Sequence, residues 1–402
     1  MIRSIEQLDL PGKRVFVRVD FNVPLGPDGS VGDDSRIVAS LPTLRYLIGK
    51  GARLVVASHL GRPKGKVDPK QSLKPVRDLL AKFLRQPVGF AETIIGPQAE
   101  AASSALPDGG VLLLENLRFE AREEANDPGF SRALAALGDA YVNDAFGAAH
   151  RAHASITGIT AYLTENAAGF LLEREVAALG RLLSGPDHPY VAILGGAKIS
   201  GKIDVLRNLL PRVDRVAIGG GMMFTFARGK GLETGRSLVE ADRVPVAKGL
   251  LDDAAAARKL LLPVDCLVAE DASGKDPGRV VPVSAIPADG AGVDIGPETL
   301  ASIAEALSEA RTVFWNGPMG VFEVPRYAEG TIGVAQEVAR ATKRGAFTVV
   351  GGGDSLAAVK QAGVEGQISH CSTGGGASLE FLEGEVLPGI AALEAAAKAR
   401  AR

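Results

Sequence analysis

The sequence predicts an α/β fold with parallel sheets divided between two domains. Short Val/Ile/Leu-rich runs recur along the chain, and each ends in Gly, Asp, Asn or His before a stretch with helical periodicity. The apolar runs are nearly continuous, as in parallel strands that are buried on both faces. The chain has 402 residues, and at roughly 150 residues per domain it is long enough for two or three compact units.

The predicted elements alternate along both halves of the chain. In the first half we expect strands at Arg14–Val19, Arg53–Ala57, Val111–Leu114 and Ala140–Asn143, and helices at Ser35–Gly49, Ser72–Leu84 and Phe130–Leu137. In the second half we expect strands at Tyr190–Leu194, Arg215–Ile218, Leu261–Val268, Thr312–Trp315 and Phe347–Val350.

An amphipathic helix separates the two halves. It begins at Leu171 and stops at a Gly-Pro pair, which predicts a domain junction there. We therefore expect an N-terminal domain over residues 1–170, an interdomain helix over 171–184 and a C-terminal domain over 185–385. The last segment, 386–402, holds an Ala-rich helix that buries little area by itself, so it must dock on one of the two domains.

Composition excludes several classes of protein. With 46% hydrophobic and 23% charged residues, the chain can bury sizeable cores and is not predicted to be disordered. The formal net charge of −2 leaves no global basic field for a nucleic acid. No apolar run approaches the roughly 20 residues of a membrane span, and the N-terminus lacks the pattern of a secretion signal. Two cysteines, Cys266 and Cys371, are too few for a disulfide scaffold and fit the cytoplasm.

Basic and polar side chains follow several predicted strands in the first half. They are Asp20, Asn22, Arg36, His59, Arg62, Arg118 and Arg151. Ligands of open parallel sheets bind at the carboxyl ends of the strands, where these side chains would converge. Because guanidinium forks match carboxylate and phosphate oxygens, the set favours a small, multiply anionic substrate. Each arginine taken alone is also compatible with a surface ion pair, and His59 with a helix cap.

The second half instead offers glycine clusters near its predicted strand ends. They are Gly195-Gly196, Gly219–Gly221, Gly351–Gly353 and Gly374–Gly376. Glycines at such positions let backbone N–H groups and a helix N-terminus reach phosphate oxygens. A tight turn or close helix packing explains a single pair equally well, whereas triplets at successive strand ends favour phosphate.

Two nucleotide motifs can be tested directly. The stretch Gly196–Lys202 fits a P-loop except that Ile203 stands where Ser or Thr would bind magnesium. We therefore interpret Lys198 and Lys202 as an i, i+4 pair on one helix face, above a phosphate chain. No strand precedes a G-x-G-x-x-G with its acidic partner, so a dehydrogenase is disfavoured. Asp354, at a predicted helix start, is a candidate magnesium ligand or a plain N-cap.

These segments together resemble the phosphoglycerate kinase family. The resembling stretches run in the family's order from about residue 14 to residue 380, so they cover essentially the whole chain; they are RVDFNVP, SHLGRP, LLENLRF, NDAFGAAHRAHAS, GGAKISGKI, GGGMMFTF, VDIGP, WNGPMGVFE, GGGDS and STGGGASLE. The resemblance implies two doubly wound parallel-sheet (Rossmann-like) domains, joined by an interdomain helix, with a deep cleft between them. It implies that the N-terminal domain binds 3-phosphoglycerate, that the C-terminal domain binds the nucleotide, and that the segment 386–402 docks back toward the N-terminal domain.

The activity implied by the resemblance is reversible, magnesium-dependent phosphoryl transfer from 1,3-bisphosphoglycerate to ADP, with closure of the two domains about a hinge. Residues matching the family's triose site are Asp20, Phe21, Asn22, Arg36, His59, Leu60, Gly61, Arg62, Arg118 and Arg151. Residues matching its nucleotide site are Lys198, Lys202, Gly221, Gly292, Asn316, Pro318, Glu323, Gly351, Gly352, Gly353, Asp354 and Ser355. The catalytic positions implied are Arg36, Lys198 and Gly375, with Asp354 as the ligand of Mg²⁺.

Two other functions remain open at this point. A kinase acting on a different carboxylic acid would share the nucleotide half, although an acid without its own phosphate leaves the arginine set unexplained. A nucleotide-binding scaffold without turnover is the non-enzymatic alternative, and the presence of Arg36, Lys198, Lys202 and Asp354 argues against it. In every case we expect small-molecule ligands, no nucleic acid or membrane partner, and, by resemblance, a monomer.

Overall fold

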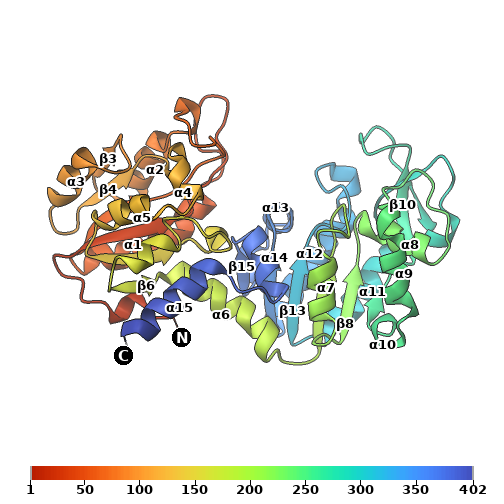
Figure 1. Ribbon diagram of the computed structural model, residues 1–402. Helices are drawn as coiled ribbons and strands as arrows, with labels where there is room; N and C mark the ends of the chain where they lie inside the picture. The colour runs from red at the N-terminus through yellow and green to blue at the C-terminus, as the bar shows by residue number, and fades with distance from the viewer. Residues whose placement is uncertain (1, 401–402) are drawn as a thin grey trace. The chain divides into compact units, whose positions relative to one another are not determined.

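The computed structural model describes residues 2–400, which contacts divide into two compact units (Figure 1). The first unit runs to Ala177 and takes up the chain again at Val386, and the second spans Ala178–Glu385. The division falls inside helix α6, Phe170–Ser184. Residues 401–402, the end of the segment expected to form the C-terminal helix, lie outside the described residues, as does residue 1.

The first unit is built on a six-stranded parallel sheet with the order β3-β4-β2-β1-β5-β6. Its strands are β1 (Arg14–Val19), β2 (Arg53–Ala57), β3 (Val88–Ala91), β4 (Val111–Leu114), β5 (Ala140–Asp144) and β6 (Asn166–Ala168). Its helices are α1 (Ser35–Gly49), α2 (Lys74–Leu84), α3 (Pro97–Ser104), α4 (Ala121–Glu124), α5 (Pro128–Ala135) and α15 (Pro388–Arg400).

Both faces of this sheet are covered, which explains why its strands are uninterrupted apolar runs. On one face Val15 and Val17 of β1 join the main core together with Leu44 of α1. On the other face the rings of Phe16 and Tyr141 lie 6.3 Å apart, and both side chains are fully buried. The alternation follows from the strand period of two residues.

The second unit has its own six-stranded parallel sheet, with the order β15-β14-β13-β7-β8-β9, and a separate three-stranded sheet, β11-β10-β12. Its strands are β7 (Tyr190–Leu194), β8 (Arg215–Ile218), β9 (Leu260–Leu261), β10 (Asp265–Ala269), β11 (Arg279–Pro282), β12 (Ala291–Ile295), β13 (Thr312–Asn316), β14 (Phe347–Gly351) and β15 (His370–Ser372). Its helices are α7 (Ile203–Leu209), α8 (Met222–Gly229), α9 (Val244–Asp252), α10 (Ala254–Ala257), α11 (Pro297–Ser308), α12 (Glu329–Lys343), α13 (Gly353–Gln361) and α14 (Gly376–Leu382).

The predicted α/β class with parallel sheets is confirmed, but one predicted strand is wrong. The run Leu261–Val268 is not a single strand, because it divides into β9 and β10, which belong to different sheets. Pro263 lies in the break and has no N–H to give a sheet ladder. Just beyond it, Asp265 accepts hydrogen bonds from the first turn of α11, which tie the start of β10 to that helix. β10 then pairs with β11 and β12 in the antiparallel sheet.

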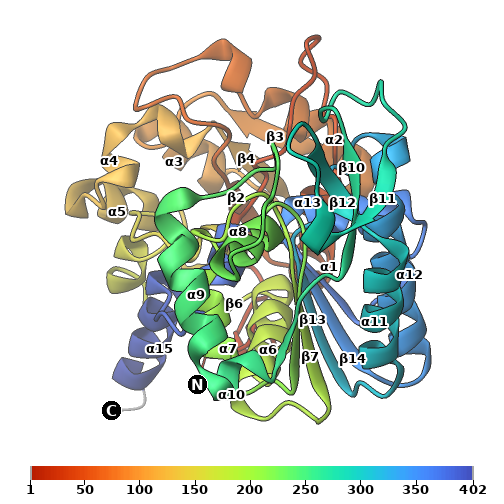
Figure 2. The same ribbon diagram turned by 90° about the vertical axis from the view of Figure 1, so that its right-hand side faces the viewer.

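Three short parallel strands, and the strands β11 and β12 of the antiparallel sheet, were not predicted. Strands β3, β6 and β15 are only three or four residues long, too short for an apolar run to be recognised. The C-terminal helix α15, the blue helix beside the C-terminus in Figure 2, packs against β6 in the first unit. Gly389 N–H, in its first turn, donates to Ala149 O at 2.8 Å. No helix within residues 2–400 is long and apolar enough to cross a membrane.

Candidate active site

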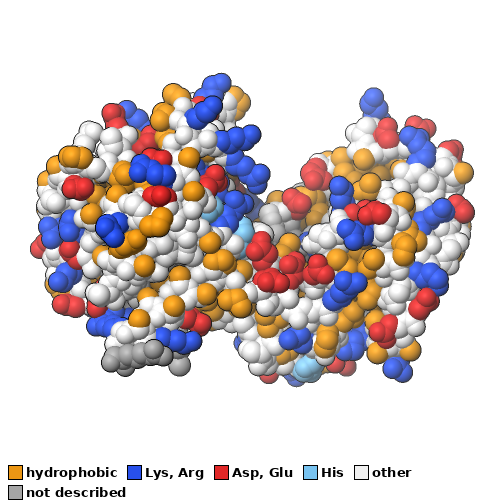
Figure 3. Space-filling model, in the orientation of Figure 1, with side chains coloured by type: hydrophobic (Ala, Val, Ile, Leu, Met, Phe, Trp, Pro, Cys, Tyr) orange, Lys and Arg blue, Asp and Glu red, His pale blue; other side chains and the backbone are white. Residues whose placement is uncertain are grey.

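Three of the predicted residues meet at the carboxyl ends of β1 and β2 in the first unit. Arg36, at the start of α1, forms an ion pair with the buried carboxylate of Asp20. His59 Nδ1 lies 3.9 Å from Asp20 Oδ1. In Figure 3, Lys and Arg side chains in blue, with His in pale blue, gather along one edge of this unit. The structure thus brings a guanidinium and an imidazole from two separate elements beside one carboxylate.

A second set of contacts joins the next predicted residues. Asn22 Oδ1 accepts a hydrogen bond from Gly61 N–H at 2.8 Å, and Arg118 Nη1 donates to Gly61 O at 2.7 Å. Gly61 has φ +62°, a left-handed conformation that favours glycine, and a Cβ there would lie 2.1 Å from Gln71 Oε1 and would displace the end of that side chain. The loop after β2 is therefore held by side chains from the segments that follow β1 and β4, which fixes the position of Arg118.

The charges of this cluster depend on its burial. Burial alone would raise the pKa of Asp20, but the positive charges of the neighbouring Arg36 and Arg18 bring that pKa below its usual value. Burial lowers the pKa of His59 well below its usual value despite the attraction of Asp20, and the arginines nearby lower it further. Asp20 is consequently a carboxylate and His59 a neutral imidazole at physiological pH.

The other predicted residues of this unit are placed nearby with fewer contacts. Phe21 is buried, with its N–H donating to Ser58 Oγ at 2.8 Å, and Leu60 is buried too. Arg62 is exposed on the loop after Gly61. Burial lowers the pKa of Arg118, and the positive charge of Arg151 lowers it further. The two guanidinium groups are therefore near enough to interact electrostatically.

Two residues of this site escaped sequence reasoning. Arg18 is 1% exposed and donates from Nη2 to His59 Nδ1 at 3.1 Å. Its signal in the sequence was a single charge inside the apolar run of β1. A Cβ on Gly147 would lie 2.4 Å from Asp20 Oδ2, so this glycine leaves room for the ion pair of Asp20. A close approach of this kind has no sequence signal.

In the second unit the glycine clusters let neighbouring strand ends approach each other closely. Gly195 N–H donates to Asn316 O at 2.9 Å, and Gly196 N–H donates to Pro318 O at 2.7 Å. A Cβ on Gly195 would lie 2.2 Å from Pro318 O, and one on Gly220 would lie 2.5 Å from Gly196 N. Part of the glycine content is thus explained by backbone packing, the alternative that the sequence left open.

The start of α13 is arranged around a glycine rather than an acidic cap. The N-cap is Gly352, with φ +91° and no side-chain hydrogen bond, so Asp354 is not an N-cap. Asn316 Nδ2 donates to Gly351 O at 2.8 Å, and Ser355 Oγ accepts from Gly317 N–H at 2.6 Å. The carboxylate of Asp354 is exposed and remains available to a ligand.

The interpretation of Lys198 and Lys202 as neighbours on one helix face is wrong. Helix α7 begins only at Ile203, and both lysines precede it in a turn. Glu240 explains the turn, because its carboxylate accepts from the N–H of Ser200 at 3.1 Å and from Ser200 Oγ at 2.6 Å, so these donors are not free to continue a helix. Burial lowers the pKa of Lys202 to about 8 against the attraction of Asp354.

A hollow of about 510 Å³ lies at these strand ends. Among the predicted residues its lining includes Gly221, Gly292, Pro318, Glu323 and Asp354, and among those not predicted Phe224, Arg236 and Leu238. A Cβ on Gly292 would lie 2.0 Å from the ring of Phe224, so this glycine lets the ring form one wall. Gly375 caps α14 with φ +55°, directly after β15, which pairs with β14. The hollow therefore combines an apolar wall with a helix start and a carboxylate, as a nucleotide would need.

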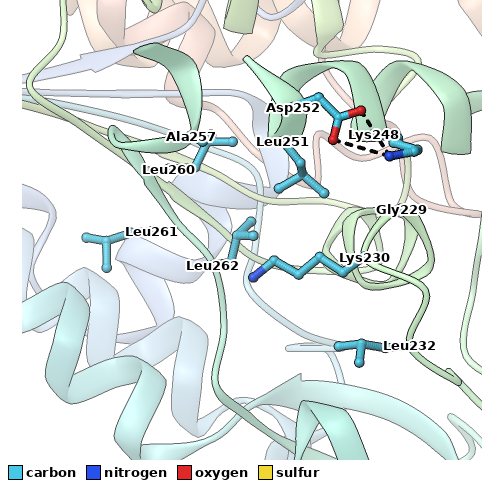
Figure 4. A pocket seen from close by; sticks show the side chains of 10 residues that line it. All are labelled: Gly229, Lys230, Leu232, Lys248, Leu251, Asp252, Ala257, Leu260, Leu261 and Leu262. Atoms are coloured by element: carbon cyan, nitrogen blue, oxygen red, sulfur yellow. Dashed lines mark hydrogen bonds and ion pairs between the residues drawn. The ribbon is translucent and has the colours of Figure 1, made fainter. Parts of the chain in front are cut away.

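Another hollow of about 800 Å³ in the same unit is lined by none of the predicted residues (Figure 4). Leucines from α9, β9 and the adjoining loops surround it, and Lys248 and Asp252 form an ion pair at its rim, 2.9 Å apart. Its lining has no glycine-rich strand end, so the smaller hollow is the better candidate for phosphate binding.

An α/β protein with an arginine cluster at one set of parallel strand ends, and glycine-lined helix starts with lysines at another, is typical of phosphate-handling enzymes. The chain belongs to the phosphoglycerate kinase family, whose sequence profile matches residues 5–385. It is therefore a kinase, a phosphotransferase with a carboxyl group as acceptor.

Relatives along the whole chain agree with this assignment. Phosphoglycerate kinase of Chlorobaculum tepidum is 54% identical over 392 residues, covering 97% of this chain and 99% of the relative. That of Chlorobium chlorochromatii is 55% identical over the same length, with the same coverage. The solved phosphoglycerate kinase of Coxiella burnetii is 41% identical, with a TM-score of 0.88 over 98% of this chain and 99% of that one.

Proposed function

We propose that the enzyme transfers a phosphoryl group reversibly from 1,3-bisphosphoglycerate to ADP, giving 3-phosphoglycerate and ATP, in glycolysis, gluconeogenesis or carbon fixation. The observation that carries this proposal is the cluster at the strand ends of the first unit. There Arg36 and His59 lie beside Asp20, while Asn22 and Arg118 hold the adjoining loop. A substrate with a carboxyl group and a separate phosphate makes use of several cations, whereas acetate or glycerate would leave most of them unpaired.

Each residue of the cluster then has a role in binding the triose. The phosphate of the triose is bound by His59, Arg62, Arg118 and Arg151. Its hydroxyl group hydrogen-bonds to Asp20 and Asn22, which also orient the loop around it. Phe21, Leu60 and Gly61 supply the backbone between them. Arg36 is partly exposed and paired with a buried carboxylate, so its free N–H groups are oriented for a second anion. We assign to it the reacting carboxyl group and the charge on the moving phosphoryl.

The nucleotide occupies the hollow of about 510 Å³ in the second unit. Gly221, Gly292 and Pro318 line the nucleoside, Glu323 accepts from the ribose, and Asn316 positions Gly351. Lys202 contacts the nucleotide phosphates, and Lys198 the transferred group. The N–H groups of Gly352, Gly353 and Ser355 at the start of α13, and of Gly375 before α14, face phosphate oxygens.

The residues present fit a magnesium ion that is delivered with the nucleotide. Asp354 offers one exposed carboxylate in the first turn of α13 and lines the hollow. In nucleotide enzymes Mg²⁺ is typically bound by one or two carboxylates together with substrate phosphates. When bound there, the ion neutralises phosphate charge. Asp354 and Lys202 would keep the phosphate chain aligned around it.

The chemistry requires neither a covalent intermediate nor a general base. The acceptor carboxylate of 3-phosphoglycerate is ionised at neutral pH, so no proton has to be removed from it. The transferred phosphoryl spreads negative charge over its equatorial oxygens, and catalysis consists of in-line alignment and fixed positive charge. Arg36 and Lys198 supply this charge, and the N–H of Gly375 adds a donor.

The substrates bind to different units, so we propose that the units close on each other by bending of the 171–184 segment. Small-angle scattering with both substrates present should show compaction, and an unchanged radius of gyration would contradict the bending. We further propose that the enzyme is a monomer and works in the cytoplasm, where its two cysteines stay reduced.

The assignment of Arg36 is tested with the variant Arg36→Ala. Loss of an arginine that stabilises a phosphoryl-transfer transition state costs on the order of 10³ to 10⁵ in rate, and we expect kcat to fall by about tenfold or more. Arg45→Ala is the matched control, because Arg45 is exposed on the same helix and donates only to Phe83 O among its described contacts. Near-normal kcat in Arg36→Ala would contradict the assignment.

A further inference from the structure

Arg18 is a buried guanidinium that does not belong to the residues assigned to substrate. It lies inside strand β1 and is 1% exposed. Nε donates to Ser155 Oγ at 2.8 Å, Nη1 donates to Val19 O, and Nη2 lies 3.1 Å from His59 Nδ1. Because it is this deeply buried, Arg18 is not in a position to touch a substrate from solvent.

The contact between Arg18 and His59 determines where the imidazole carries its proton. A guanidinium has only donors, so Nδ1 of His59 must be the acceptor. The proton of the neutral ring is then on Nε2. Asp20 Oδ1 lies 3.9 Å from the same Nδ1, which is too far for a hydrogen bond that would impose the opposite tautomer.

We propose that Arg18 is a positioning residue that fixes His59 in the Nε2–H tautomer, so that His59 presents an N–H donor to an anionic oxygen of the triose. The part that concerns the triose rests on the proposed function. The tautomer itself is a property of the free protein and does not depend on it.

The surroundings of Arg18 keep its own orientation fixed. Ser155 Oγ donates to Glu123 Oε1 and accepts from Arg18 Nε, and Ser155 N–H donates to Glu123 Oε2 at 2.9 Å. Glu123 and Ser155 are both fully buried. Arg18 is therefore the donor on both sides, to His59 Nδ1 on one and through Ser155 to the buried carboxyl group of Glu123 on the other, and each group has a defined donor or acceptor role.

The charged groups facing His59 also favour a neutral ring. Burial lowers the pKa of His59, Asp20 opposes this, and Arg18, Arg118 and Arg36 lower it further. Without Arg18 one cation is lost while Asp20 remains, so His59 should take up a proton at higher pH than in the native enzyme. A protonated ring donates from both nitrogens and no longer has one defined donor.

The first test is nitrogen NMR of histidine-labelled full-length enzyme without substrate, in which protonated and unprotonated ring nitrogens have well-separated shifts. We expect Nε2 of His59 to carry the proton and Nδ1 to be unprotonated. Observation of the Nδ1–H tautomer would overturn the proposal. An enzyme that shows the expected tautomer but no turnover of 3-phosphoglycerate would refute the proposed function and leave the tautomer assignment standing.

The second test is Arg18→Met, with Arg14→Met as control, because Arg14 lies on the same strand and pairs with Asp139 away from the cluster. In Arg18→Met we expect mixed tautomers, a higher titration midpoint for His59, and a KM for 3-phosphoglycerate raised by roughly tenfold with a smaller change in kcat. A single Nε2–H tautomer with unchanged KM and pH profile would overturn the proposal.

Should Arg18→Met fail to fold, Arg18→Lys decides between the same outcomes. An ammonium keeps the positive charge but does not reproduce the fork that reaches Ser155 and His59 together. We expect mixed tautomers and a raised KM with little change in the titration midpoint of His59. Native KM together with a pure Nε2–H tautomer would show that charge alone suffices and would overturn the positioning role.

Discussion

Replacing Lys202 with methionine should stabilise the second unit while removing a contact to the nucleotide. Burial lowers the pKa of this lysine from 10.5 to about 8, against the attraction of Asp354. Each pKa unit corresponds to about 1.4 kcal/mol, so the charged amine is disfavoured in the folded enzyme by about 3 kcal/mol. Methionine has a similar length and no charge, and it avoids this cost.

The sign of the pH dependence follows from the two pKa values. Between pH 8 and 10.5 the unfolded chain keeps the proton of Lys202 while the folded enzyme releases it, so native stability rises with pH in this window. The advantage of Lys202→Met is therefore complete below about pH 8 and vanishes above about pH 10.5. Residual solvation of the amine makes about 1–3 kcal/mol at pH 7 the expected gain in unfolding free energy.

Trp315 provides the assay, because it is the chain's single tryptophan and is fully buried in β13 of the second unit. Guanidinium unfolding followed by its fluorescence, at pH 7 and pH 10.5, measures the difference between Lys202→Met and the native enzyme at each pH. Lys198→Met is the matched control, because Lys198 is exposed in the same turn. We expect the control to change stability by less than about 0.5 kcal/mol at both pH values.

The result that would refute this reasoning is a stability difference for Lys202→Met that is the same at both pH values, or a loss of stability at pH 7. Either result would mean that the charged amine of Lys202 is well solvated in the folded enzyme, or that its attraction to neighbouring groups offsets the whole cost of burying its charge. The KM for nucleotide should rise in the same variant. A gain of stability together with weaker nucleotide binding is expected when a buried charge destabilises the folded enzyme but is needed to bind the ligand.

Three further substitutions test the second unit. Gly195→Ala should lower the unfolding free energy of this unit by about 1–3 kcal/mol, because the new methyl group would meet the backbone oxygen of Pro318. Gly249→Ala in α9 should raise it by about 0.5–1 kcal/mol, because a Cβ there meets nothing within 4 Å. Trp315 fluorescence measures both changes, and equal effects would contradict the close approach of the strand ends. Asp354→Asn should raise the half-saturating concentration of Mg²⁺ by about tenfold or more in steady-state assays with thermal stability unchanged, and a normal magnesium requirement would exclude Asp354 as a ligand.

The sequence predicts the parallel strands well because their two-sided burial leaves uninterrupted apolar runs. The strand β1 and the helix α1 match the predicted bounds in full. The antiparallel sheet was not predictable in the same way, since β11 is largely exposed and its residues carry no burial pattern. In the run from Leu261 to Val268 two short strands of different sheets follow each other, and hydropathy alone does not separate them.

The candidate site could be predicted as a set of residues but not as a network. Side chains that follow strands are visible in the sequence, and the structure places Asp20, Arg36 and His59 together. The role of Arg18 depends on three-dimensional burial, and a lone charge within a strand indicates it only weakly. The turn that holds Lys198 and Lys202 depends on Glu240, about 40 residues further along the chain, and local spacing does not predict such a contact.

The most direct test of the central claim is a coupled steady-state assay with ATP, Mg²⁺ and 3-phosphoglycerate, run beside glycerate and acetate as alternative acceptors. We predict turnover with 3-phosphoglycerate and none above background with the other two acids, because only the phosphorylated acid engages the arginine cluster of the first unit. Comparable turnover with glycerate or acetate would contradict the assignment of that cluster, and no turnover with any acceptor would contradict the proposed reaction.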